Sequence, residues 1–464
     1  MTFSPSGNSL QARDIAAVVH PYTHLKKHLT EGPMVVVRGE GVRVWDDSGK
    51  DYIEGMAGLW SASLGFGNQR LVDAATRQMK QLPFYHAFAG KSHEPIIELS
   101  EMLLQRAPVP MARVLFANSG SEANDSAMKL VWYYNNALGR PNKKKIISRI
   151  KGYHGVTIAS ASLTGLPNNH RDFDLPIANV VHTDCPHHYR YAAAGESEED
   201  FATRLAASLE RKILEEGPDT VAAFIAEPVM GAGGVIVPPR TYFEKIQPVL
   251  KKYDLLLIAD EVICGFGRTG SYWGCQTLGI KPDILTCAKA LSASFLPISA
   301  ILIGEKVWQA MLAESEKIGV FGHGFTYSGH PVPAAVAVEA LKIYDERDLV
   351  GHVRDVAPVL QAGLRKFADH PLVGEVRGIG LLGALELVQN KQTKEPFAPT
   401  AGAGAAVSRH AQAHGAIVRN MGDTVAFSPP LIISKAETEE LLSRTHRALD
   451  GALADLRAQG IAIG

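Results

Sequence analysis

At residues 113–125 the chain reads RVLFANSGSEAND, an apolar run followed by a cluster of small polar residues. The run Arg113–Ala117 predicts a short buried strand, and Asn118–Ser121 predicts the turn that ends it. Beyond the turn, apolar residues recur with helical spacing, at Ala123, Ala127, Leu130, Val131 and Tyr134. The stretch therefore predicts a strand, a tight junction and a helix in succession.

The same alternation continues downstream. Phe201, Leu205, Leu209 and Ile213 recur every four residues, which predicts a helix that ends at Gly217-Pro218. Short apolar runs predict buried strands at residues 221–226, 255–258 and 284–287. Strands separated by helices favour an α/β fold with a mainly parallel sheet covered on both faces. Ligands of such sheets bind beyond the carboxyl ends of the strands.

The two ends of the chain have a different pattern. Residues 34–54 predict a hairpin, and a new set of helices and strands begins after about residue 345. We expect both ends to form one smaller α+β domain. The predicted division is residues 1–64 and 346–464 for the small domain and residues 65–345 for the large one.

Composition limits the possible functions. The 464 residues carry a formal net charge of -1, which gives no electrostatic footprint for nucleic acid or for an anionic membrane surface. The four cysteines form no CxxC pair and no disulfide framework is expected. No stretch reaches ~18 apolar residues, and no basic-then-apolar leader pattern opens the sequence. We therefore expect a cytoplasmic protein without a membrane anchor.

Three polar features follow predicted strands. The junction at Ser119, Gly120 and Ser121 offers free N–H groups at a helix start, which suit a phosphate. Asp260 follows one apolar strand and suits a cation, and Lys289 follows another, where partial burial favours Schiff-base chemistry. Each has an ordinary alternative when taken alone: a helix cap, an ion pair and a surface lysine.

The features occur together with other motifs in a fixed order. The matching segments are residues 118–125, Tyr153-His154-Gly155, Glu227-Pro228, residues 260–270, residues 288–292 and residues 325–331. In this order and spacing the chain resembles the class III pyridoxal-phosphate aminotransferases of fold type I over residues 20–450. The resemblance implies a large domain with a mainly parallel seven-stranded sheet between helices, a small α+β domain, and pyridoxal 5'-phosphate as cofactor.

The resemblance also implies roles for single residues. Lys289 would carry the cofactor as a Schiff base and act as the base, and Asp260 would pair with the ring nitrogen. Thr326 would reach the phosphate of the neighbouring subunit's cofactor, which implies a homodimer with shared sites, or a tetramer. The other cofactor contacts would be Ser119, Gly120 and Ser121 at the phosphate, Tyr153 and Val262 on the two ring faces, Glu227 at the phenolic edge, and His154.

Two positions at which the chain differs from some family members bear on the substrate. Family members that act on ornithine or 4-aminobutyrate typically carry a Glu and an Arg at positions that here are Ala232 and Ala426. The chain instead resembles the (S)-selective amine:pyruvate branch, the ω-transaminases, in which Arg419 would bind the carboxylate of pyruvate. The substrate walls would be Leu59, Trp60, Phe88 (from the partner subunit), Tyr153 and Ala232. Core packing is the alternative for Trp60 and Phe88, and a surface ion pair is the alternative for Arg419.

Other interpretations stay open. The donor could be putrescine, β-alanine, taurine or an aryl-alkyl amine, and an aminomutase, racemase or decarboxylase can share the scaffold. A non-enzymatic binding protein is disfavoured by Lys289 with Asp260, and a Rossmann protein is disfavoured because no GxGxxG opens the first strand–helix unit. The histidines of residues 182–188 predict a turn-rich loop, and His20, His24 and His28 predict a stripe on a helix, so no metal site is expected. Ser294-Phe295 replaces the Gly-Tyr usual in relatives and has no explanation from sequence.

Overall fold

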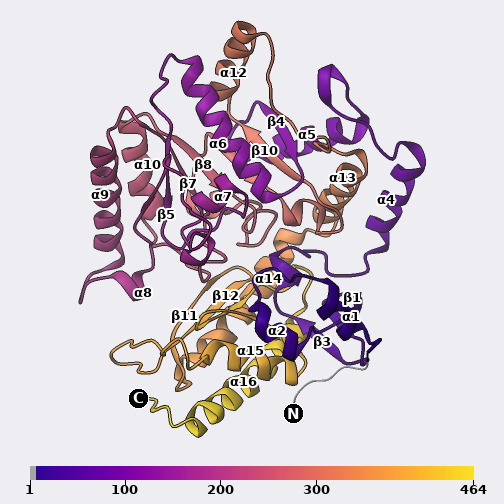
Figure 1. Ribbon diagram of the computed structural model, residues 1–464, viewed down its shortest axis with the longest axis vertical. Helices are drawn as coiled ribbons and strands as arrows, with labels where there is room; N and C mark the ends of the chain where they lie inside the picture. Colours follow the sequence, from indigo (N-terminus) through magenta and orange to yellow (C-terminus); the bar gives the residue numbers. More distant parts are fainter. Residues whose placement is uncertain (1–6) are drawn as a thin grey trace.

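The computed structural model describes residues 7–464, and a seven-stranded sheet forms its centre (Figure 1). The strand order is β4-β10-β9-β8-β7-β5-β6, and β10 alone runs antiparallel to its neighbours. The strands of the sheet are β4 (Arg113–Ala117), β5 (Lys145–Arg149), β6 (Val180–Thr183), β7 (Val221–Ala226), β8 (Leu256–Asp260), β9 (Ile284–Cys287) and β10 (Ser299–Ile303). The predicted mainly parallel sheet of seven strands is confirmed.

Helices cover both faces of this sheet, which explains why every residue of its central strands β7 to β10 is buried. All six residues of β7 are buried, with Phe224 packed into the core on one face and Ile225 into the core on the other. Helix α9 (Glu198–Glu216) lies over the first face and α6 (Gly120–Ala137) over the second. The helical stripes expected from the sequence are the buried sides of these two helices.

Other helices complete the layers. The remaining helices of seven or more residues are α1 (Leu10–Ala17), α2 (Leu25–Glu31), α4 (Gln69–Gln81), α5 (Glu94–Arg106), α10 (Tyr242–Lys252), α12 (Glu305–Ile318), α13 (Pro331–Glu346), α14 (Leu349–Lys366), α15 (Ala403–Ala413) and α16 (Lys435–Ala458). The shorter ones are α3 (Ala57–Trp60), α7 (Ile158–Leu163), α8 (His188–Tyr191), α11 (Gly274–Leu278), η1 (Phe88–Gly90), η2 (Pro167–Asn169), η3 (Lys289–Ser292) and η4 (Phe367–Asp369).

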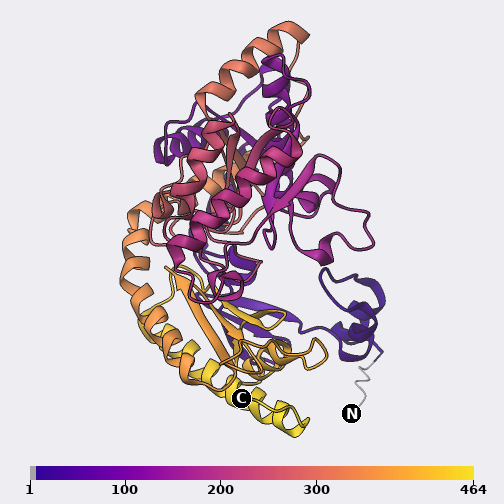
Figure 2. The ribbon, with the colours of Figure 1, turned by 90° about the vertical axis from the view of Figure 1, so that its left-hand side faces the viewer.

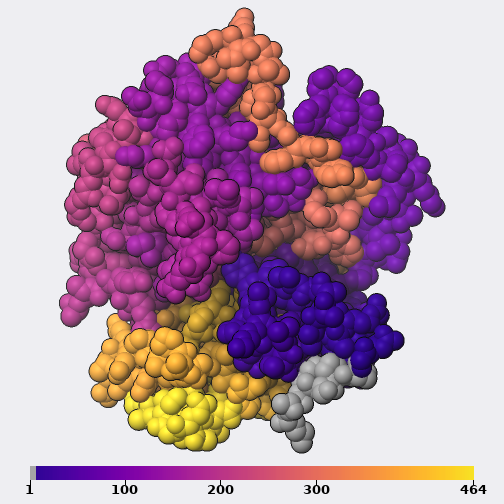
Figure 3. Space-filling view, viewed as in Figure 1, coloured from indigo at the N-terminus to yellow at the C-terminus, as the bar shows by residue number. Residues whose placement is uncertain are grey.

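Two four-stranded sheets lie below the central one (Figure 1). The N-terminal part of the chain, in indigo, and the C-terminal part, in yellow, both lie in this lower region (Figure 3). The first sheet has the order β1-β2-β3-β13 and the second β11-β12-β15-β14. Their strands are β1 (Val36–Glu40), β2 (Arg43–Asp46), β3 (Asp51–Glu54), β11 (Val373–Ile379), β12 (Leu382–Leu387), β13 (Ala416–Ile417), β14 (Arg419–Met421) and β15 (Thr424–Phe427). The parallel pairing of β13 with β3 joins both termini in one sheet. The domain boundaries stay a prediction.

Helices α14 and α16 contact each other along one edge of the molecule (Figure 2). Helix α14 also packs on β11 and β12, and α13 packs on α4 and α5 beside the central sheet. The consecutive helices α13 and α14 thus connect the upper and lower parts of the fold.

The predicted helical stripe of His20, His24 and His28 is wrong. Helix α2 begins only at Leu25, with the His24 imidazole accepting a hydrogen bond from the Lys27 N–H at the helix start. The backbone of Tyr22 has a positive φ of 51°, which a helix does not allow. Within residues 7–464, none of the helices has the length and apolarity to span a bilayer.

Candidate active site

Several polar side chains meet at the carboxyl ends of the central strands. Glu227 follows β7, Asp260 ends β8, and Lys289 comes two residues after β9. Strand β4 ends just before α6 begins, so the amino end of α6 also lies at this edge of the sheet and lines the same cavity. Together these residues line an inner cavity of about 340 Å³, where a mainly parallel sheet is expected to bind its ligand.

The start of α6 forms an anion-binding cradle. Ser119 caps the helix, its hydroxyl accepting from the Glu122 N–H at 3.2 Å, and the Ser121 hydroxyl accepts from the Val156 N–H at 3.1 Å. The first N–H groups of a helix lack intrahelical acceptors and carry the positive end of its dipole. Gly155 closes the cradle at φ 138°, where a β-carbon would come within 2.5 Å of the Ser121 hydroxyl. A larger side chain there would push the cradle open.

Asp260 is buried and held by three hydrogen bonds. Its Oδ2 accepts from the Asn124 amide and from His154 Nδ1, both at 2.8 Å, and its Oδ1 accepts from the Val262 N–H at 3.1 Å. The Asn124 amide also donates to the His154 carbonyl, and its oxygen accepts from the Thr286 hydroxyl. A buried carboxylate that is so firmly oriented suits a cationic ligand in the cavity.

Lys289 lines the same cavity as that carboxylate and has a strained backbone. Its φ is 49°, in the left-handed region that lysine rarely adopts, and η3 begins at this residue. Burial lowers the pKa of the Lys289 ammonium, while the nearby Asp260 and Glu227 carboxylates act in the opposite direction. The net lowering increases the neutral fraction of the amine, which is the nucleophilic and basic form.

Glu227 ties two loops of the site together. Its Oε1 accepts from the Tyr153 N–H at 3.0 Å, and its Oε2 accepts from the Gly231 N–H at 2.9 Å. Burial raises the pKa of this carboxyl. Burial also raises the pKa of the Tyr153 phenol, and the adjacent Tyr22 hydroxyl raises it further.

An outer cavity of about 830 Å³ adjoins the inner one through Tyr153, Ile263 and Lys289. Leu59, Trp60, Ala232 and Arg419 line it, as the sequence predicted for the substrate walls. Arg419 lies on β14 directly opposite Ala426 of β15. Lys151 and Arg419 make this outer cavity cationic.

The structure brings thirteen of the fifteen predicted site residues to these two cavities. Ser119, Gly120, Ser121, Tyr153, His154, Glu227, Asp260, Val262 and Lys289 line the inner one. Phe88 and Thr326 are exposed and line neither cavity. Their predicted role across a subunit boundary stays a prediction.

Sequence reasoning missed two contributors. Asn124 binds Asp260, and its signal was available: it lies one helical turn after Gly120, inside the stretch that decides the fold. Tyr22 lines the outer cavity, where its hydroxyl accepts from the Asn169 amide at 2.7 Å. The sequence holds no local signal for this contact, because Tyr22 and Asn169 are far apart in the chain.

The unusual Ser294 now has a structural context. Ala293 and Ser294 have φ values of 49° and 62°, and the Ser294 N–H donates to the Lys289 carbonyl at 3.1 Å. This left-handed backbone is the conformation that a glycine adopts without strain. Serine keeps the same turn at a cost in strain, and its side chain lines the inner cavity.

Known proteins resemble the chain over almost its whole length. The family described as aminotransferase class-III matches residues 25–449. A relative from Oryza sativa subsp. indica named "Probable gamma-aminobutyrate transaminase 3, mitochondrial" is 53% identical over 92% of this chain and 84% of its own length. One from Solanum lycopersicum named "Gamma aminobutyrate transaminase 3, chloroplastic" is 54% identical over 90% and 80%.

Solved structures have the same fold. The omega transaminase from Pseudomonas jessenii in complex with PMP has a TM-score of 0.96 and 58% identity, covering 97% of this chain and 99% of that one. A structure described as a transaminase with L-ala has a TM-score of 0.90 and 60% identity over 91% of this chain and 100% of that one.

Proposed function

This chain belongs to the class III aminotransferases, and from that premise we propose that it transfers the amino group of an amine to pyruvate through Lys289. The chain is a pyridoxal-phosphate-dependent transaminase of fold type I. The amine and keto-acid preferences, the residue roles and the subunit arrangement below are proposals.

The residues of the inner cavity fit the cofactor. Pyridoxal phosphate requires a lysine, a carboxylate for its ring nitrogen and donors for its phosphate. Lys289, the oriented Asp260 carboxylate and the amino end of α6 surround one cavity of about 340 Å³. When bound, the cofactor supplies an electron sink for the carbanion that deprotonation of the substrate would create.

Lys289 would hold the cofactor. As a free neutral amine beside the substrate, the same side chain would accept a proton from the substrate carbon and later release it, so that one residue would serve as base and then as acid. Its lowered pKa serves this task, because an ammonium group would have no lone pair to accept that proton. Asp260 keeps the ring nitrogen protonated, and the hydrogen bonds from Asn124 and His154 keep the carboxylate aimed.

The other cavity residues position the ring and the phosphate. Ser119, Gly120 and Ser121 would bind the phosphate with their N–H and hydroxyl groups. Tyr153, Val262 and Glu227 line the same cavity and would hold the ring. In a homodimer, Thr326 of the partner subunit completes the phosphate site and Phe88 of the partner subunit completes the substrate wall. The exposure of both residues in one chain supports that arrangement.

One observation carries the choice of pyruvate: the Arg419 guanidinium has no carboxylate partner among residues 7–464. It lines the outer cavity together with Ala232 and lies opposite Ala426, and neither alanine, where some relatives carry Glu and Arg, offers it a charge. A guanidinium binds a carboxylate in a bidentate manner, so an unpaired arginine suits a keto acid. A solved omega transaminase engineered for bulky amines replaces one tryptophan, one phenylalanine and one arginine, the residue types that we assign to the substrate site.

A panel of amine donors with pyruvate, 2-oxoglutarate and a small aldehyde as acceptors tests this proposal. We expect Arg419→Ala to reduce kcat/KM with pyruvate by about 10- to 100-fold, the loss of one charge-assisted contact, and to change the aldehyde reaction little. The matched control is Arg457→Ala, which removes an exposed arginine of α16. Equal losses on pyruvate and aldehyde would remove Arg419 from carboxylate binding.

A second donor, 4-aminobutyrate, is favoured by the names of the plant relatives. Lys151 and Arg419 in the outer cavity would then bind the carboxylate of the donor as well as that of the acceptor. The donor panel separates the two candidates. An enzyme for 4-aminobutyrate should have a higher kcat/KM with that donor than with an apolar amine of similar length. Conversion of the amine without any keto acid would instead point to a mutase or racemase.

The cellular location stays a separate proposal. We propose the cytoplasm, which the four free, buried cysteines suit. The named relatives are mitochondrial and chloroplastic, so cell fractionation with organelle markers is the test.

A further inference from the structure

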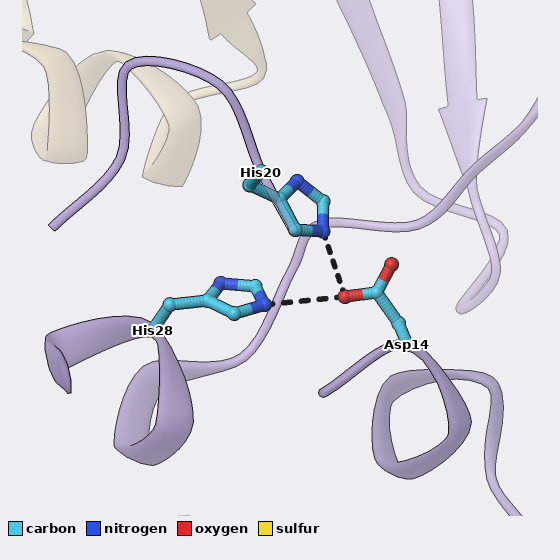
Figure 4. A group of neighbouring side chains, drawn as sticks. All are labelled: Asp14, His20 and His28. Carbon is cyan, nitrogen blue, oxygen red and sulfur yellow. Dashed lines mark hydrogen bonds and ion pairs between the residues drawn. The ribbon is translucent and has the colours of Figure 1, made fainter. Parts of the chain in front are cut away.

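Three side chains of residue types that can bind a metal lie close together in the N-terminal segment, outside the active site (Figure 4). Asp14 belongs to α1, His20 to the loop that follows, and His28 to α2. His20 Nε2 lies 2.8 Å and His28 Nε2 3.2 Å from the same oxygen, Asp14 Oδ1. One ligand atom of each residue lies within 4.8 Å of the other two.

We propose that Asp14, His20 and His28 bind a zinc ion. Two imidazole nitrogens and a carboxylate oxygen are ordinary zinc ligands, and three protein ligands leave the fourth tetrahedral position for water. The His28 side chain is 9% exposed, whereas His20 is 31% and Asp14 21% exposed. The site is therefore sheltered on one side and open to solvent on the other, which gives the ion an entry path.

A second group with similar residue types does not suit a metal. His187, Glu375 and Glu386 lie close together, but Arg377 pairs with both carboxylates, at 2.6 Å and 2.8 Å. A guanidinium at that place occupies the oxygens and repels a cation. At the Asp14 site no arginine or lysine pairs with the carboxylate among residues 7–464.

The zinc ion would fix a segment that lines the outer cavity. Pro21 and Tyr22 lie between His20 and α2, and both line that cavity. The Tyr22 hydroxyl accepts from the Asn169 amide, and the two exposed α1 and α2 helices bury no residue completely. Such a segment has little apolar packing, so a metal bond across it would supply much of its order.

Zinc content of the holoenzyme tests the site. After equilibration with Zn²⁺ and removal of excess, we expect about one zinc per wild-type chain by mass spectrometry of the metal, and less than about 0.2 in His28→Gln and Asp14→Asn. The matched control, His24→Asn, removes a histidine of the same segment that lies outside the cluster and retains a helix cap. This variant should keep about one zinc per chain.

Hydrogen exchange provides a readout that is independent of activity. Added Zn²⁺ should slow amide exchange in residues 18–31 at least about threefold in the wild type and leave His28→Gln unchanged. Wild-type protein without stoichiometric zinc would show that the cluster is a hydrogen-bonded pair of histidines only. Equal zinc in the wild type and both ligand variants would place the metal elsewhere, and either result would overturn the proposal.

Discussion

Glu54 precedes the turn that carries Trp60 of the outer cavity and accepts a hydrogen bond from that turn. Titration of its carboxyl should make the free energy of unfolding depend on pH. The side chain is 5% exposed, and its Oε1 accepts from the Met56 N–H at 2.8 Å. The loop that follows is strained, with φ values of 47° at Ala57 and 65° at Trp60. Burial raises the pKa of Glu54 from 4.5 to about 7, while the hydrogen bonds from Met56 and Gly58 act in the opposite direction.

The sign and size of the effect follow from linkage. The folded-state pKa is raised, so the unfolded chain loses the Glu54 proton at a lower pH than the folded chain, and stability falls as the pH rises through about 7. A shift from 4.5 to about 7 corresponds to about 3 kcal/mol in full and to about 2.5 kcal/mol between about pH 5 and about pH 8.5.

The variant Glu54→Gln keeps an acceptor for the Met56 N–H and removes the titration. Unfolding entropy of about 2.1 cal/mol/K per residue over 464 residues is about 1 kcal/mol/K, so the melting midpoint of the wild type should fall by about 2–3 °C relative to the variant across that pH range. Differential scanning calorimetry of both proteins measures it. The control is Glu439→Gln, at an exposed position of α16, which should follow the wild type. Parallel curves for wild type and Glu54→Gln would refute a buried, neutral Glu54.

Two further substitutions probe the cofactor cavity. Asn124→Ala removes the amide that donates to Asp260, and we expect about 10- to 100-fold weaker retention of the cofactor, measured by dialysis and absorbance, because a hydrogen bond to a charged group is worth about 1.5–3 kcal/mol. Unchanged retention would mean that His154 and the Val262 N–H suffice to orient the carboxylate. Ser294→Gly should raise the free energy of unfolding by about 1 kcal/mol, because glycine relieves the strain at φ 62°, and denaturant unfolding measures it. A destabilised Ser294→Gly would show that the serine side chain stabilises the turn.

Local sequence patterns predicted the parts of the fold that depend on local physics. The junction after Ala117 is predictable from sequence. It has an apolar strand before it and a helical stripe after it, with only a few small polar residues between them. The same holds for Lys289, because a lysine just after a buried strand is unusual and, together with Asp260, indicates a functional site. Trp60 and Arg419 needed the family resemblance, because an aromatic or a cation alone is common in a protein.

Contacts between distant segments escaped prediction. Tyr22 reaches the outer cavity through a loop with a positive φ, and periodicity carries no information on where such a loop packs. The His20–His24–His28 spacing predicts a helix because residues four apart share a helical face, but the turn at Tyr22 delays the helix to Leu25. The pairing of His20 and His28 with Asp14 therefore became visible only in three dimensions.

Borohydride reduction followed by peptide mapping tests the central claim, that Lys289 carries the cofactor beside Asp260. Reduction fixes the cofactor to its lysine, and mass spectrometry of the digested holoenzyme identifies that residue. We predict a phosphopyridoxyl group on Lys289 and none in Lys289→Ala. Lys151 lines the neighbouring cavity and is the internal comparison. A label on Lys151, or an equal label in Lys289→Ala, would contradict the account.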